Sequence, residues 1–263
     1  MKLINGFKSY APTMAKQNTG FDKKSYEFLF KLEEKNFWFK SRNRLIIYFI
    51  GKYFGNKGLF LEIGCGTGFV LQGIKENFSQ IKCHGSEIYT KGLKFSQKRV
   101  PDSELFQMDA RNIPFKNKYN LVGAFDVIEH IEEDEIVLRQ IYKTLKKSGV
   151  VTITVPQHQF LWSKIDEFAF HKRRYNKKDL INKLQKSGFK IIRATSFVSV
   201  LLPFMFISRF INKQNTFDPV KEFQINFILN KIFEWCLAIE RVLIKVGFNF
   251  PFGGSLIIAA KKK

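Results

Sequence analysis

The sequence predicts an α/β fold, with a mostly parallel sheet of seven strands and helices on both faces. Short apolar runs alternate with amphipathic segments from residue 59 onward. Glycines follow the first apolar run directly, and the β-branched run Val150–Val155 stops at Pro156. Strands that alternate with helices form parallel sheets covered on both faces. A chain of 263 residues has room for one such domain with an insertion.

Each expected strand is a run of apolar or β-branched residues that ends at a turn residue. In chain order the strands are Leu59–Ile63, Ile81–Ile88, Leu105–Met108, Asn120–Phe125, Val150–Val155, Phe189–Ala194 and Ser255–Ala260.

Helices are expected where apolar residues recur every three or four positions. Residues 1–20 are polar and show no period, so we expect them to be loosely ordered. Gly149 and Gly188 are typical of helix ends and should stop the last two helices. The expected helices cover residues 22–55, 68–78, 90–99, 132–147 and 176–187.

These elements divide the chain into four segments. An N-terminal helical segment or lid (1–57) precedes the core (58–195), and a helical insertion (196–254) precedes the final strand (255–263). The insertion has about sixty residues, far more than a hairpin connection needs.

The insertion has two parts. The apolar run Phe197–Ile211 contains Pro203, and at about 1.5 Å per residue it is too short for a bilayer core of about 30 Å. Charged residues recur through Phe223–Val246, which predicts an amphipathic helix and not a membrane span. A lid, a dimer surface and a membrane-docking element all stay open, and nearby Arg209 and Lys213 would suit an anionic bilayer. Asn226, Asn230, Glu234, Arg241 and Lys245 mark the polar side of the second part, and Ile225, Ile228, Leu229, Ile232, Cys236, Ile239, Val242 and Val246 line the other.

The composition bounds the partners and the compartment. The formal net charge of +21 attracts polyanions, whether nucleic acid, anionic lipid or a phosphorylated substrate. The three cysteines, Cys65, Cys83 and Cys236, form no CxxC pair, so neither disulfides nor a zinc site are expected. No apolar signal sequence begins the chain. A cytoplasmic protein is expected, with peripheral contact at the inner face of the membrane left open.

A glycine-rich turn carries the strongest functional signal. Gly64, Gly66 and Gly68 follow the first strand and open a helix, where the backbone turns tightly or a ligand comes close. Glu87 ends the second strand, where a carboxylate can accept both ribose hydroxyls of an adenosine cofactor. A dinucleotide fingerprint would need a third glycine where Phe69 stands. The pattern therefore suits a nucleoside that carries an amino-acid tail.

In order and spacing, four motifs resemble those of class I S-adenosylmethionine (SAM)-dependent methyltransferases. They are Leu61–Gly68, Glu87, Met108-Asp109-Ala110 and the run 125–130, and the resemblance covers roughly residues 40–195 and the last strand. It implies a Rossmann-like fold, SAM as the cofactor and methyl transfer as the activity. By the same resemblance Glu62 and Gly64 lie by the methionine moiety, Glu87 binds ribose, Asp109 meets the adenine amino group, and Phe125 and Asp126 border the sulfonium and substrate. Gly66, Gly68 and Ala110 are further candidate contacts of the cofactor.

A second likeness concerns the acceptor. Two groups of residues are similar to those of bacterial type-11/12-like enzymes. The first is an aromatic-basic cluster with Trp38 and Arg42, and the second is Trp162 with the run Arg173-Arg174-Tyr175. Several of those act on glycan, lipid or quinone-type acceptors. These residues are therefore candidate substrate contacts, and the two neighbouring arginines could hold a phosphate or carboxylate.

Methyl transfer to a hydroxyl is accelerated by a general base. His130 and His171 are the leading candidates, together with Asp126, and His158 ranks below them. The spacing Asp126-x-x-Glu129-His130 is also similar to the metal-binding cluster of ubiquinone-biosynthesis O-methyltransferases. A divalent ion there would acidify a hydroxyl, but a helix start explains Glu129 equally well, so no metal ligand is assigned.

The sequence thus predicts a SAM-dependent methyltransferase that acts at oxygen on a small-molecule, glycan or lipid-linked acceptor. RNA is the alternative substrate that the charge permits, although the chain shows no RNA-binding appendage. A non-catalytic SAM-binding protein is a third interpretation, against which the intact glycine motif argues. The oligomeric state is left open.

Overall fold

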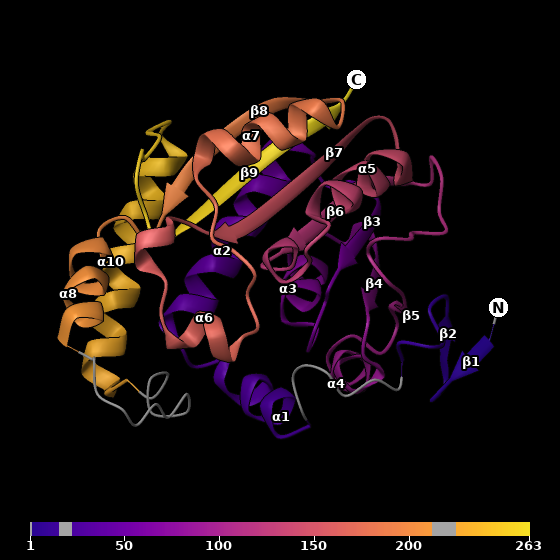
Figure 1. Ribbon diagram of the computed structural model, residues 1–263, viewed down its shortest axis with the longest axis horizontal. Coiled ribbons are helices and arrows are strands. Elements are labelled where there is room, and N and C mark those ends of the chain that lie inside the picture. Colours follow the sequence, from indigo (N-terminus) through magenta and orange to yellow (C-terminus); the bar gives the residue numbers. More distant parts are fainter. Residues whose placement is uncertain (1, 16–22, 212–224) are drawn as a thin grey trace.

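The computed structural model describes residues 2–15, 23–211 and 225–263. They form one sheet in the order β1-β2-β5-β4-β3-β6-β7-β9-β8, with helices on both faces (Figure 1). The strands from β2 to β7 pair in parallel, and β9 lies antiparallel between β7 and β8. The strands are β1 Lys2–Ile4, β2 Phe7–Ser9, β3 Lys57–Ile63, β4 Gln80–Glu87, β5 Glu104–Gln107, β6 Tyr119–Phe125, β7 Leu145–Pro156, β8 Phe189–Phe197 and β9 Ser255–Lys262.

All seven predicted strands are present, and two more precede them. The expectation of a loosely ordered N-terminus was wrong for β1 and β2, which form a hairpin at the β5 edge. Asn5 and Gly6 have φ of 52° and 85°, so they form the two-residue turn that Asn-Gly favours. Gln107 secures the hairpin, because its Oε1 accepts hydrogen bonds from Ser9 Oγ at 2.7 Å and the Ala11 N–H at 3.1 Å.

Two predicted helices have different bounds. The helical stretch 22–55 is two helices, because Asn36 caps the second by accepting a hydrogen bond from the Trp38 N–H at 2.9 Å. The helix expected to end at Gly149 ends at Thr144, because β7 begins at the next residue. The helices are α1 Lys23–Leu32, α2 Phe37–Tyr53, α3 Phe69–Asn77, α4 Thr90–Arg99, α5 Asp134–Thr144, α6 Lys164–Phe168, α7 Lys177–Lys186, α8 Leu202–Ile211 and α10 Phe227–Lys245.

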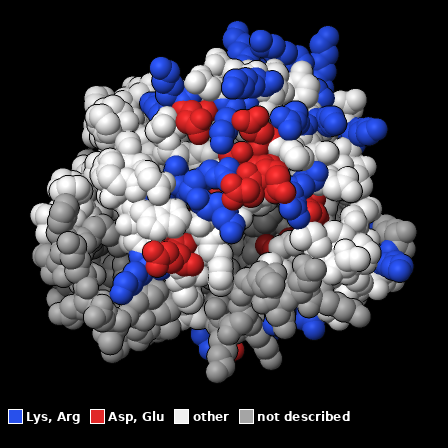
Figure 2. Space-filling view, viewed as in Figure 1, with Lys and Arg blue, Asp and Glu red and all other residues white. Residues whose placement is uncertain are grey.

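The core has two layers, one on each side of the sheet. Apolar side chains of α2, α3, α4 and α10 pack with one face, and those of α5 and α7 pack with the other. Basic side chains crowd the edge of the molecule where α7 lies, while acidic ones gather near the middle of the face shown (Figure 2). On this face the positive charge is therefore uneven.

The insertion lies beside α2 at one end of the molecule (Figure 1). The second predicted helix of the insertion is α10; residues 212–224, including Lys213 and Phe223, lie outside the described residues. Pro203 stands in the first turn of α8, where proline is tolerated. Within the three described ranges, no helix combines the length and apolar character that crossing a bilayer requires.

Candidate functional site

A cavity of about 1540 Å³ opens at the carboxyl ends of the central parallel strands. It is lined by the turn after β3, the ends of β4 and β6, the segment after β5, and parts of α1, α2, α8 and α10. Ligands of open α/β sheets bind at this edge, and the volume exceeds what one small ligand needs. The cavity can therefore receive a cofactor and an acceptor together.

The glycine turn forms one wall of the cavity. Gly64, Gly66 and Gly68 all have positive φ, of 67°, 52° and 82°, which side chains rarely tolerate. A Cβ at Gly64 would lie 2.5 Å from Val127 Cγ2, and one at Gly68 would lie 2.9 Å from Ser96 Cα. A Cβ at Gly66 would meet none of the described residues within 4 Å. The first and third glycines thus allow close packing, whereas Gly66 leaves space that a ligand can fill.

Two buried carboxylates flank this turn. Glu87 accepts backbone N–H bonds from Ile88 at 2.8 Å, Gly66 at 3.2 Å and Tyr89 at 3.3 Å. Burial raises the pKa of Glu87, and these hydrogen bonds oppose that rise. Glu62 lines the cavity, and its buried Oε2 has no hydrogen-bond partner in the part of the chain that the structure describes. An unsatisfied buried oxygen beside an open glycine turn fits a ligand that carries hydrogen-bond donors.

Asp109, Ala110 and Phe125 complete this half of the lining. The carboxylate of Asp109 accepts hydrogen bonds from Arg111, from Nη2 at 2.9 Å and from the backbone N–H at 2.9 Å. Arg111 also contacts Glu133 at 3.2 Å, so the end of β5 is tied to the start of α5. The predicted cofactor residues therefore line the cavity, except Gly68, which packs against Ser96.

Arg42 and Asp126 join α2 to the end of β6 across the other half. The Arg42 guanidinium stacks 4.7 Å from the Trp38 ring centroid and forms an ion pair with the Asp126 carboxylate. Thr154 Oγ1 also donates to that carboxylate at 3.1 Å. Asp126 has φ of +56°, a strained value for a residue with a side chain. Because Asp126 is engaged by two donors, the base role predicted for it is less favourable than that of a histidine.

His171 is held by a carboxylate in the same half. Its Nδ1 lies 2.8 Å from Asp166 Oδ1, and Arg174 donates to the same carboxylate at 2.8 and 2.9 Å. Burial alone would raise the pKa of Asp166, but the hydrogen bonds from His171 and Arg174 lower it to about 2. The carboxylate is therefore ionised at neutral pH and fixes the imidazole ring.

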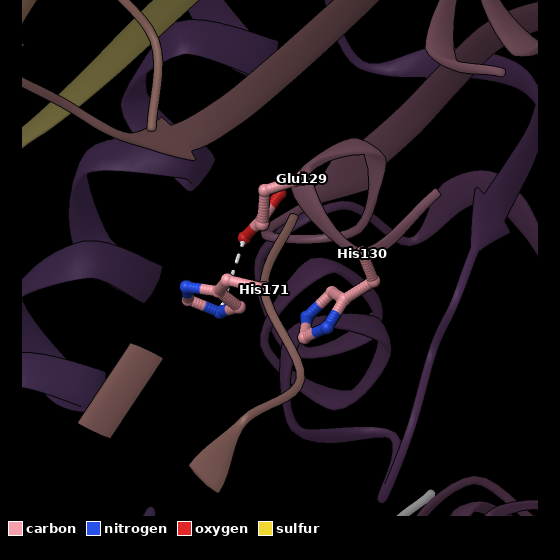
Figure 3. A group of neighbouring side chains, drawn as sticks. All are labelled: Glu129, His130 and His171. Carbon is pink, nitrogen blue, oxygen red and sulfur yellow. Dashed lines mark ion pairs between the residues drawn. The ribbon is translucent and has the colours of Figure 1, made fainter. Parts of the chain in front are cut away.

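Glu129, His130 and His171 form a cluster beside this pair (Figure 3). Their nearest ligand-type atoms lie within 4.8 Å of one another, with 4.0 Å between Glu129 Oε1 and His171 Nε2. Burial lowers the pKa of His130 to about 4 and raises that of Glu129 well above its usual value. Neither carboxylate oxygen of Glu129 has a hydrogen-bond partner among the described residues. The cluster could hold a cation, with His171 and not the arginine-paired Asp126 as the third group.

Three of the predicted substrate residues do not line the cavity. Tyr175 is fully buried and donates its hydroxyl to Asp134 Oδ2 at 2.6 Å. Arg173 pairs with Glu132 at 2.8 Å, and Trp162 is half-buried beside a short turn. By contrast, Trp38, Arg42 and Arg174 do line the cavity.

His158, the lower-ranked candidate base, also lies outside the cavity lining. Its ring stacks on Phe160, with 5.0 Å between ring centroids.

One polar junction was missed by the sequence reasoning. Glu33, before α2, accepts hydrogen bonds at 2.5 Å from Thr67 in the glycine turn and from Arg99 at the end of α4. Arg99 also stacks 4.1 Å from the Phe30 ring centroid and donates to that residue's carbonyl. These contacts hold the segment at the end of α1 against the glycine turn and α4. The members of the junction are far apart in the sequence, so no spacing could have revealed it.

The model of the methyltransferase-domain family matches residues 33–194. The chain belongs to this family, and the predicted class of SAM-dependent methyltransferase, with its cofactor and Rossmann-like fold, is confirmed.

Two curated relatives are similar to parts of the chain. Demethylmenaquinone methyltransferase of Thermotoga maritima is 27% identical over 94 residues, which cover 35% of this chain and 41% of that protein. Phosphoethanolamine N-methyltransferase 2 of Caenorhabditis elegans is 26% identical over 194 residues, which cover 70% of this chain and 43% of that protein. The chain thus spans about two fifths of the length of these relatives.

Solved structures share the fold at low identity. Phosphoethanolamine N-methyltransferase 2 of Haemonchus contortus, in complex with S-adenosyl-L-methionine, has a TM-score of 0.62 at 18% identity, over 93% of this chain and 58% of that one. A SAM-dependent methyltransferase of Thermotoga maritima has a TM-score of 0.59 at 17% identity, over 91% and 96%. Most of this chain therefore shares its overall fold with solved methyltransferases.

Proposed function

We propose that the chain transfers the methyl group of SAM to a hydroxyl oxygen of an acceptor in the cavity, with His171 as the general base. The observation that carries this proposal is the pairing of His171 with Asp166 at the cavity wall. When bound, the cofactor supplies a methyl group on a positively charged sulfur, which leaves as a neutral thioether. The chain's own residues must hold the acceptor and remove its proton.

The Asp166–His171 pair suits proton removal. With the Nδ1 proton donated to Asp166 at 2.8 Å, Nε2 carries the lone pair that accepts a proton. Because the pKa of Asp166 is held at about 2, its negative charge stabilises the imidazolium that forms. His130 has a pKa lowered to about 4 by burial and the neighbouring His171, so at neutral pH it is uncharged and can accept a hydrogen bond from the acceptor.

The cofactor belongs to the half of the cavity formed by the glycine turn. Gly64, Gly66 and the unpaired oxygen of Glu62 would hold the amino-acid tail, while Glu87 would hold the ribose. Open space at Gly66 and the unsatisfied Glu62 support this assignment. Asp109, Ala110 and Phe125 would border the adenine and the reacting sulfur.

The acceptor is a small-molecule, glycan or lipid-linked alcohol. Apolar side chains of the insertion, including Phe204, Leu229 and Phe233, line its part of the cavity. The arginines expected to clamp a phosphate are engaged, Arg174 by Asp166 and Arg173 by Glu132. An uncharged acceptor region is therefore favoured over the phosphate groups of RNA.

The test uses the full chain with SAM labelled in its methyl group and small-molecule, glycan and lipid extracts as separate acceptor pools. The labelled product is isolated and its methyl position is assigned by nuclear magnetic resonance. We expect an O-methyl ether. A label on nitrogen or carbon would refute the proposed acceptor atom, and these are the positions named for the phosphoethanolamine enzymes and for a geranyl diphosphate C-methyltransferase of similar fold.

A further inference from the structure

Helix α10 packs on the protein through a side that holds its two carboxylates together with the buried Leu237 and Ile244. Glu234 accepts hydrogen bonds from Lys40 at 2.8 Å and Arg44 at 2.7 Å, both on α2. Glu240 accepts from the backbone N–H groups of residues 199 and 200 at 2.7 and 2.9 Å. Asn230 Oδ1 accepts from the Phe37 N–H at 2.8 Å. Both carboxylates of α10 are therefore turned inward and satisfied.

The opposite side of α10 is apolar and exposed. Ile228, Ile232, Trp235, Ile239 and Val242 are spaced by three or four residues, and each is at least half exposed. Trp235, at the middle of the strip, is 73% exposed. An amphipathic helix normally buries this side, and an exposed apolar patch of this kind marks an interaction surface.

The patch continues onto α8, so it is broader than the seam of a coiled coil. The two helices lie side by side (Figure 1), with 6.3 Å between the ring centroids of Phe204 and Phe233. Phe204 and Ile207 of α8 are both more than half exposed. A broad apolar surface across two helices suits a bilayer better than a narrow partner helix.

The charges of this surface have one sign. The exposed charged residues of α10 are Lys231 and Lys245, of which Lys231 also lies 3.9 Å from the inward-facing Glu234 carboxylate, and the helix exposes no carboxylate. The whole chain has a formal net charge of +21. Lysines beside an apolar surface complement anionic headgroups, and tryptophan is favoured at the boundary between headgroups and acyl chains.

We propose that α8 and α10 dock the protein on an anionic phospholipid bilayer by inserting this apolar face. Phe204 and Leu229 are exposed and also line the cavity, so docking places the cavity's apolar rim at the bilayer. A lipid-linked alcohol would enter there. That entry route rests on the proposed function, whereas docking itself does not.

The test is flotation of the full chain with vesicles of phosphatidylcholine, alone or mixed with phosphatidylglycerol. We expect the protein to float with the mixed vesicles, less so at high salt, with a blue shift of tryptophan emission. A Trp235→Ser/Ile239→Ser variant should bind at least about tenfold more weakly. Leu3→Ser is the matched control, because Leu3 is 71% exposed but lies on β1 at the far end of the molecule (Figure 1).

A second variant tests the charge. Replacing Lys231 and Lys245 by Gln should weaken binding to the mixed vesicles roughly 30-fold and leave binding to phosphatidylcholine unchanged. The proposal is overturned if the unmodified chain does not float. It is also overturned if sedimentation shows that the unmodified chain is a dimer and that the Trp235→Ser/Ile239→Ser variant is a monomer, because the surface would then pair two copies. Flotation without O-methylation would refute the proposed function and leave docking intact.

Discussion

The cofactor half and the acceptor half of the cavity are built in different ways. The cofactor half comes from the ends of successive strands, from Glu62 to Asp109, and its key feature is backbone shape at a glycine turn. The acceptor half joins Arg42, Asp126 and His171 with an insertion that begins after β8. Its key features are side-chain pairs: Arg42–Asp126 joins distant segments, and Asp166–His171 joins residues five positions apart. The first half depends on backbone geometry, and the second on electrostatic contacts between side chains.

The largest expected effect is the loss of cofactor binding through a change in the cofactor half alone. Gly66→Arg should fold, since no atom that the structure describes lies within 4 Å of the Cβ position, but the side chain would occupy the cavity. We expect SAM binding to fall below detection by calorimetry. Gly55→Arg is the matched control, because Gly55 also has positive φ and an open Cβ position but does not line the cavity. Both variants should lose about 1–2 kcal/mol of stability. Unchanged SAM affinity in Gly66→Arg would refute the cofactor assignment.

The next effect separates acceptor chemistry from cofactor binding. His171→Gln should lower kcat by about 10²–10⁴-fold, because the base is lost. The Kd for SAM, measured by calorimetry, should not change. His158→Gln is the control, because His158 lies outside the cavity lining. Equal losses in the two variants, or normal turnover of His171→Gln, would contradict the role proposed for His171.

The same division explains what the sequence could predict. Glycine spacing, a preceding apolar run and an acid at the next strand end are local patterns, and they located the cofactor half. The Asn5-Gly6 hairpin was also readable from its turn residues, but the surrounding polar composition suggested disorder. His171 was visible as a candidate base, and Asp166 is an acid five residues before it in the sequence. Their pairing was not visible, because it depends on how the loop after β7 folds back.

The insertion shows what the spacing of apolar residues cannot predict. Helical spacing predicted an apolar side of α10, but it could not say which side faces the protein, and it did not assign the buried Leu237 and Ile244. That choice depends on Lys40 and Arg44, nearly two hundred residues earlier in the chain, which supply partners for Glu234. The Tyr175 hydroxyl is a similar case, because its partner Asp134 lies on another element.

A smaller effect should follow from that ion-pair junction. Glu234→Gln should cost about 1–2 kcal/mol at pH 7, because two cations lose a partner that is only 10% exposed. Burial raises the pKa of Glu234, but the hydrogen bonds and charges of Lys40 and Arg44 lower it by more, so its pKa lies below the usual value. The stabilisation is therefore lost as pH falls through the lowered pKa. The difference in free energy of unfolding between the unmodified protein and Glu234→Gln, measured with urea, should therefore disappear below about pH 4. Glu135→Gln, which removes an exposed helix pair, should change stability by less than about 0.5 kcal/mol.

The smallest effect has the opposite sign and concerns Glu129. Burial, helped by the charge of Asp126, raises the pKa of Glu129 well above its usual value. The native state then keeps a proton that the unfolded chain loses, so stability falls as pH rises above about 4.3. Glutamine has the shape of the protonated acid and cannot ionise. Glu129→Gln should therefore raise Tm by about 2–4 °C at pH 8 and leave it unchanged at pH 4.

Thermal unfolding with added Mn²⁺ or Mg²⁺ decides whether a proton or a metal ion neutralises the charge of the buried Glu129 carboxylate. If the metal stabilises the unmodified protein and not Glu129→Gln, the cluster of Glu129, His130 and His171 holds a cation, and the proton account is wrong. Equal responses of the two proteins would leave the proton as the compensating charge. Glu129 would then stabilise the fold only when neutral, whereas Glu234, at the contact between α10 and α2, stabilises it when ionised.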